Sequence, residues 1–102
     1  MIGSEKQVKW ANQILDDALK ACKDNMACFS ETHRTEKGLY VAQPERIEVL
    51  KEVINTIENV RSTQSAAWII ENRYKYETKQ IFYIIDKEVM RRKEIARRNG
   101  GI

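Results

Sequence analysis

Residues 4–26 read SEKQVKWANQILDDALKACKDNM, and this stretch decides the fold class of the chain. Apolar residues recur in it at steps of three and four, which places them on one face of a helix. Ser4 and Gln7 have the spacing of a capping box, in which each side chain bonds the backbone amide of the other residue. The pattern predicts a helix from about Glu5 to about Cys28, with Cys22 as a small thiol on its buried face.

Two more helices are expected in the middle of the chain. Pro44 suits the first position of a helix, because its missing N–H would be unpaired there, and an apolar stripe carries the helix to about Arg61. Residues 66–73, AAWIIENR, predict a short helix of high apolar density. Because of that density, we expect Trp68, Ile69 and Ile70 to lie between the amphipathic faces of the other helices.

A last helix is expected from about Tyr76 to about Arg98. Asn99 and Gly100 are a plausible stop, since both residues tolerate the left-handed conformation. The apolar face of this helix comprises Ile81, Phe82, Ile84, Ile85, Val89, Ile95 and Ala96.

Residues 29–43 lack a helical period and are expected to form one long irregular connection. Thr35–Gly38 is typical of a turn, with Gly38 available for a positive φ, and the three residues after it are expected to be extended. Long connections in small domains are often functional or mobile. The alternative is a plain connector that Phe29, Leu39 and Val41 pin to the core.

Length and composition favour one globular domain over residues 1–102. The chain has 102 residues, 42% hydrophobic and 32% charged, with one proline and four glycines. No apolar run approaches the roughly 20 residues that a membrane span needs, and the N-terminus lacks the apolar segment of a signal peptide. We therefore expect an all-α protein of the cytoplasm, a small irregular three- to four-helix bundle that does not bind membranes.

Positive charge gathers at the C-terminus, in the basic terminal helix of residues 87–102. Six basic residues stand there against Glu88 and Glu94, so this segment carries +4 while the whole chain carries +3. Such a helix could bind phosphate, or its cations could complement the negative end of the helix dipole. The six charges surround the helix instead of forming one stripe, which favours the second interpretation.

Two shorter patterns also suggest contact surfaces. Glu88 and Arg92 are spaced i, i+4 inside the apolar arc, either as a solvated pair or as part of a partner or oligomer surface. Residues 73–76 interleave cations with tyrosines, which could stack on nucleobases or lean on the bundle as a helix connection. The candidate binding surface therefore comprises Lys87, Arg91, Arg92, Lys93, Arg97, Arg98, Arg73, Tyr74, Lys75 and Tyr76.

Catalytic signals are weak. His33 lies near Cys28 in the irregular segment, where a Cys/His dyad is conceivable but the spacing establishes no geometry. The chain has no Gly-rich phosphate loop, no paired-Cys metal spacing and no His-Glu-x-x-His. We therefore expect no enzyme, no catalytic residues, no cofactor and no metal site.

Two strings resemble a family of small helical proteins from bacteriophages and other bacterial mobile elements. Residues 3–14, GSEKQVKWANQI, are similar to an opening that reads GSEKQ, a hydrophobe, then a Trp-Ala pair and an Ile. Residues 66–73 are similar to a later Ala-x-x-Trp-Ile-x-x-x-Arg-like segment of the same proteins. The resemblance implies a shared helical fold and supplies no catalytic residues.

Together these observations predict a non-catalytic protein-binding factor from a phage or mobile element. Its partner would be a host or mobile-element protein, for example a nuclease complex that it inhibits in the manner of an anti-CRISPR protein. Nucleic-acid mimicry is not expected. The alternative is a small nucleic-acid-binding accessory protein that uses the basic C-terminal helix.

Overall fold

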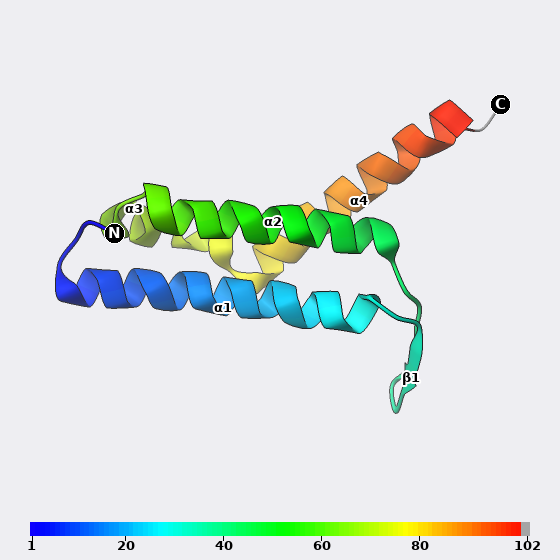
Figure 1. The fold of residues 1–102 in the computed structure, drawn as a ribbon, viewed down its shortest axis with the longest axis horizontal. Coiled ribbons are helices and arrows are strands. Elements are labelled where there is room, and N and C mark those ends of the chain that lie inside the picture. The colour runs from blue at the N-terminus through cyan, green and yellow to red at the C-terminus, as the bar shows by residue number, and fades with distance from the viewer. Residues whose placement is uncertain (101–102) are drawn as a thin grey trace.

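The protein is a small bundle of helices with one short hairpin, as a computed structural model shows (Figure 1). The structure describes residues 1–100. The elements are α1 (Glu5–Phe29), β1 (His33–Thr35), β2 (Gly38–Tyr40), α2 (Pro44–Thr63), α3 (Ala66–Glu71), the 3-10 helix η1 (Arg73–Tyr76) and α4 (Thr78–Gly100). Helices α1 and α2 run antiparallel side by side, and α4 projects beyond the bundle. The predicted all-α class is confirmed.

The start of α1 is capped as the sequence predicts. The backbone N–H of Gln7 donates to the Ser4 hydroxyl over 3.2 Å, and the Ser4 N–H donates to the Gln7 side chain over 3.1 Å. These bonds pair two of the amides that every helix start leaves free. The helix then continues to Phe29, one residue past its expected end.

The connection after α1 contains a hairpin that the sequence analysis missed. Thr35 and Gly38 pair across the turn, and Gly38 has the positive φ expected of it, +128°. Strands of three residues are too short for a visible alternation of apolar and polar residues. The alternative in which Phe29, Leu39 and Val41 pin this segment to the core is wrong for Leu39 and Val41, which are 54% and 56% exposed, whereas Phe29 is half-buried.

The core lies between α1, α2, α3 and the first half of α4. Ile69 of α3 is completely buried, whereas Trp68 and Ile70 are half-buried at the edge of the core. The expectation that all three lie between the other helices is therefore correct only for Ile69. The fully or nearly buried apolar residues are Ala11, Leu15, Ala18, Leu19, Cys22, Val49, Leu50, Ile57, Ala66, Ile69, Ile81, Ile85 and Val89.

The last helix departs from its prediction at both ends. It begins at Thr78, because residues 73–76 form the separate 3-10 turn. Asn99 and Gly100 are helical, so α4 runs two residues past its expected end at Arg98, and residues 101 and 102 lie outside the described part of the chain. Burial along α4 ends at Val89, so the apolar face expected at Ile95 and Ala96 is exposed.

Two arginines of α2 tie this helix to its neighbours. Arg46, only 11% exposed at its side chain, donates to Asn25 of α1 over 2.7 Å and to Asp86 of α4 over 2.5 Å. At the other end of α2, Arg61 donates to Asn12 over 2.5 Å and pairs with Asp16, both on α1. The polar contacts therefore fix both ends of the α1–α2 pair.

The two strings behind the family resemblance meet in space. The Ala66 N–H donates to the Ile2 carbonyl over 2.8 Å, which joins the chain start to the start of α3. Gly3 has φ +153°, and a Cβ at this position would lie 2.8 Å from the Cβ of Ala66. The chain start can therefore pack this closely on α3 only with glycine at position 3 and a small residue at position 66. Both strings thus have a structural role.

The capping box predicts the effect of Ser4→Ala. Loss of a cap costs about 0.5–2 kcal/mol, so the free energy of unfolding in urea should fall by that amount. Ser62→Ala is the matched control, since the Ser62 hydroxyl donates to the Asn59 carbonyl within α2 and caps nothing. An equal loss in both variants would contradict the assignment.

Burial predicts opposite results for two leucines. Leu50 is completely buried, so Leu50→Ala should lower the free energy of unfolding by about 2–5 kcal/mol. Leu39 is 54% exposed, so Leu39→Ala should change the free energy of unfolding by about 0.5 kcal/mol or less. A large loss at Leu39, measured by the same denaturation, would show that the hairpin packs on the bundle.

Candidate protein-binding groove between α2 and α4

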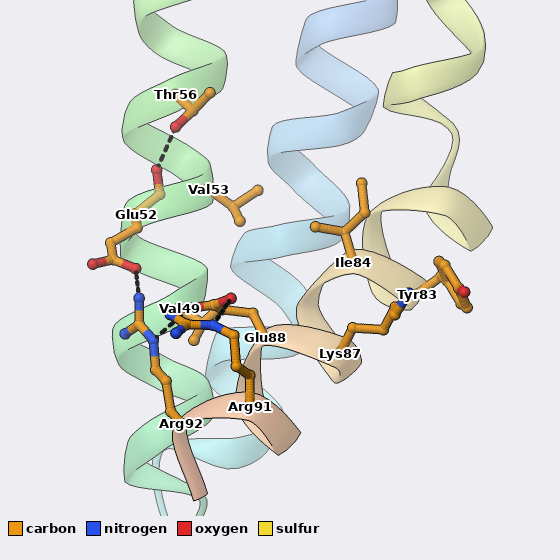
Figure 2. A pocket seen from close by; sticks show the side chains of 10 residues that line it. All are labelled: Val49, Glu52, Val53, Thr56, Tyr83, Ile84, Lys87, Glu88, Arg91 and Arg92. Atoms are coloured by element: carbon orange, nitrogen blue, oxygen red, sulfur yellow. Dashed lines mark hydrogen bonds and ion pairs between the residues drawn. The ribbon is translucent and has the colours of Figure 1, made fainter. Parts of the chain in front are cut away.

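A groove runs between α2 and α4 on the side where the two helices diverge. Its wider part encloses about 630 Å³, and Figure 2 shows side chains of both helices pointing into it. Val53 and Ile84 face each other across this part, and cations of α4 line its lower edge. The lining residues are Val49, Glu52, Val53, Thr56, Tyr83, Ile84, Lys87, Glu88, Arg91 and Arg92.

A second hollow of about 320 Å³ extends the first towards η1. The two hollows share Val53, Thr56 and Ile84, so they form one continuous trough, which we call the α2–α4 groove. The second hollow adds two apolar residues and a polar end, which are Ile57, Ile81, Lys75 and Tyr76.

The periodicity of α4 explains why the groove exists. Ile81, Ile85 and Val89 recur every four residues and are buried against the bundle. Ile84 directly precedes Ile85 in the sequence, so its side chain lies on the flank of this buried stripe. No other helix covers it there, and it is 47% exposed. The apolar arc of α4 is thus wider than the part that α1 and α2 cover, and the uncovered residue Ile84 lines the groove.

Glu88 holds two arginines at one end of the groove. Arg91 donates to its carboxylate over 2.6 and 2.9 Å, and Arg92 donates over 2.9 Å while also pairing with Glu52 of α2. These hydrogen bonds lower the pKa of Glu88 from 4.5 to about 2. Glu88 itself therefore pairs within α4, and Arg92 carries the link to α2 through Glu52.

The lysines of the groove have aromatic neighbours instead. The Lys75 ammonium lies 5.5 Å from the centre of the Trp68 ring, and the Lys87 ammonium lies 5.1 Å from that of Tyr83. Neither lysine forms an ion pair with a carboxylate of residues 1–100. A cation over an aromatic face keeps most of its charge available to an incoming anion.

The predicted segment 73–76 is divided between two sides of the molecule. Lys75 and Tyr76 line the groove, and burial raises the pKa of Tyr76. Arg73 instead lies over the ring of Trp10 on α1, 5.5 Å from its centre, and Tyr74 is 56% exposed. The segment is therefore a helix connection that leans on the bundle, with only half of it at the groove.

The rest of the predicted basic surface lies on the projecting part of α4. Arg97 and Arg98 pair with Glu94 within the helix, whereas Lys93 pairs with none of the carboxylates in residues 1–100. Met90 and Ile95 are 70% and 42% exposed beside these charges. The structure thus brings Lys75, Tyr76, Lys87, Arg91 and Arg92 to one groove and leaves Lys93, Arg97 and Arg98 beyond its end.

The apolar residues of this surface were missed as site residues. Ile84 was placed on the core face, and Tyr83 and Met90 were assigned to no surface. The signal was present in the width of the apolar arc, which exceeds what a helix needs to pack on one neighbour.

The hairpin brings Cys28 and His33 to one shallow depression, together with Tyr40. His33 Nδ1 lies 3.0 Å from the Glu31 carbonyl oxygen, and its ring stacks on Tyr40 at 5.5 Å. Cys22 is buried as predicted, and burial raises the pKa of its thiol. Both cysteines are free thiols.

Within residues 1–100, no cluster of three or more His, Cys, Asp or Glu side chains has a geometry that could hold a metal ion. The same residues include no helix with the length and apolar character needed to cross a membrane. Comparison with known proteins finds no matching family model, no similar curated protein and no similar solved structure.

The hydrogen bonds of Glu88 with Arg91 and Arg92 predict a pH-dependent stability. A carboxyl whose pKa is lowered by folding stabilises the fold above its unfolded pKa and loses this effect as the pH falls through its folded pKa. For Glu88 that window runs from 4.5 down to about 2. Glu88→Gln should therefore lower the free energy of unfolding at about pH 7 and lower it less at about pH 3, as measured in urea.

Glu94→Gln is the matched control for this experiment. Within residues 1–100, Glu94 pairs only with Arg97 and Arg98 of its own helix, and exposed pairs of this kind contribute about 0–1 kcal/mol. An identical pH dependence in the two variants would show that the hydrogen bonds of Glu88 with Arg91 and Arg92 do not stabilise the fold.

Proposed function

We propose that this chain is a non-catalytic protein-binding factor that uses the α2–α4 groove and the projecting part of α4. The observation that carries the proposal is the exposed apolar surface of α4 beside arginines that already have carboxylate partners. Protein interfaces are enriched in Arg, Met and aromatic residues, and contiguous exposed apolar patches mark sites of protein association. Tyr83, Ile84, Met90 and Ile95 of α4 are between 42% and 70% exposed.

The pairing of the arginines favours a protein partner over nucleic acid. Arg91, Arg92, Arg97 and Arg98 each bind a glutamate carboxylate. A phosphate would have to displace these internal partners before it gained the full attraction of each guanidinium. Of the cations in residues 87–102, only Lys87 and Lys93 lack a carboxylate partner within residues 1–100, and two such lysines supply few of the contacts that make nonspecific nucleic-acid binding strong.

The setting of this function follows from the family resemblance. We propose that the chain acts in the cytoplasm of a bacterial cell on behalf of a phage or mobile element, and that its partner is a host or mobile-element protein. Inhibition of a host defence nuclease, as by anti-CRISPR proteins, fits a small factor of this kind. The nucleic-acid-binding alternative is supported by the +4 charge of residues 87–102.

Charge removal on α4 separates the two functions. Arg91, Arg97 and Arg98 are replaced together by Gln, and the partner is first captured from a bacterial host lysate, identified by mass spectrometry and purified. The variant should bind it with slower association at low salt and with less change in dissociation, because exposed charges mainly steer encounter. Stopped-flow or surface binding kinetics measure both rates.

The control removes the same charge elsewhere. Arg34, Lys37 and Lys51 are exposed and lie on the hairpin and on α2, and their replacement by Gln should slow association less. A wild-type protein that binds a random duplex of about 30 base pairs with micromolar affinity at about 150 mM salt would instead support the alternative. Its salt slope should then fall by about 0.7–0.9 for each phosphate that the α4 variant no longer binds.

A further inference from the structure

We infer that the α2–α4 groove binds an amphipathic helix of the partner whose apolar stripe is flanked by acidic side chains. The inference rests on the proposed function and names the part of the partner that the groove recognises. It is carried by the shape and chemistry of the groove: an apolar strip of Val53, Ile84 and the mostly buried Ile81, with Lys75 at its η1 end and Lys87 on the α4 wall, neither of them paired with a carboxylate of residues 1–100.

The strip has the length and spacing of a helix contact. On α4, Ile84 and Arg91 line the groove seven residues apart, and Ile95 continues the same flank four residues further on, beyond the groove. Eleven residues of helix separate Ile84 from Ile95, a distance of about 16 Å at 1.5 Å per residue. A partner helix of three turns matches this length with apolar residues at i, i+4, i+7 and i+11.

The groove fits a helix better than an extended strand because its walls have no free backbone groups for a strand to pair with. Both walls are helices, α2 and α4, whose backbone amides are bonded within their own turns. An extended peptide would find no free backbone groups to pair with and would leave its own unpaired against an apolar floor, which is costly. A helix satisfies its own backbone and presents only side chains.

The charges of the groove select acidic flanks. Lys75 lies at the η1 end of the strip and Lys87 lies on the α4 wall, and within residues 1–100 neither meets a carboxylate. Arg91 and Arg92 add further positive charge, although Glu88 and Glu52 balance most of it. Carboxylates on the partner would therefore pair mainly with the two lysines.

Charge also argues against a second copy of this chain as the occupant. Its exposed apolar helix is the projecting part of α4, within the segment that carries +4. Two such helices, or one of them in the groove of another copy, would bring like charges together, which is unfavourable. Self-association is consequently an outcome that would contradict the inference.

The test selects helices for the groove directly. A phage-displayed library of helical peptides, randomised at surface positions among apolar, acidic, basic and neutral polar residues, is panned on the full-length protein. The recovered peptides should show an apolar stripe with Asp or Glu beside it, and should bind about tenfold or more weakly to Ile84→Asp and to Lys87→Glu. Peptides with lysine in place of the acidic residues should recover affinity for Lys87→Glu.

Matched controls lie on the hairpin. Leu39→Asp places the same charge on an equally exposed apolar residue, and Lys37→Glu reverses a charge far from the groove, so both should bind the peptides like the wild type. Circular dichroism confirms that each variant folds, which is expected because Ile84 is 47% exposed.

Recovery of no helix, of helices without acidic bias, or of peptides that bind Ile84→Asp as well as the wild type would overturn the inference. A concentration-dependent dimer that Ile84→Asp dissociates would assign the groove to a second copy and overturn it as well. Capture of a protein partner whose binding survives Ile84→Asp would leave the proposed function standing and remove only the helix-binding groove.

Discussion

The Arg46 guanidinium, a charge with only 11% of its side chain exposed where α1, α2 and α4 meet, is the group on which the arrangement of the helices depends. A buried charge without partners would cost several kcal/mol. Asn25 and Asp86 bond its N–H groups, and the rings of Phe29 and Phe82 lie 5.3 and 5.9 Å from it. One side chain of α2 thus contacts both α1 and α4 and ties the three helices together.

This interaction also determines which side of α4 is left open. Asp86 and Ile84 lie on opposite flanks of the buried stripe of Ile81, Ile85 and Val89. With Asp86 held by Arg46, rotation of α4 about its axis is fixed, and Ile84 is turned towards the groove. Beyond Val89, the Arg92–Glu52 pair joins α4 to α2 once more. The groove therefore results from an apolar arc of α4 that is wider than its buried stripe, and the Arg46–Asp86 and Arg92–Glu52 pairs help to hold α4 in the orientation that leaves Ile84 open.

Much of the fold could be predicted from the sequence because its signals are local. The capping box at Ser4, the first position of Pro44 and the apolar stripes all act within a few residues. The hairpin was missed because three-residue strands carry too little pattern. The exposure of Ile95 could not be predicted, because burial depends on where the neighbouring helices end, and α4 extends beyond them. The partial burial of Trp68 likewise depends on how the helices pack around α3. The overall shape reflects this, with a radius of gyration of 16.3 Å against about 13 Å for a compact domain of this length.

The candidate site was predictable only in part for a related reason. The cations of the C-terminal helix were visible in the sequence, but their partners Glu52 and Glu88 decide how much of their charge is free. A carboxylate that approached Arg91 would compete with Glu88, so the net gain from that pairing would be small. Lys75 and Lys87, which have no such competitor within residues 1–100, offer more to an acidic partner. Specific binding would then come from the apolar strip around Ile84, with the lysines determining which partners are accepted.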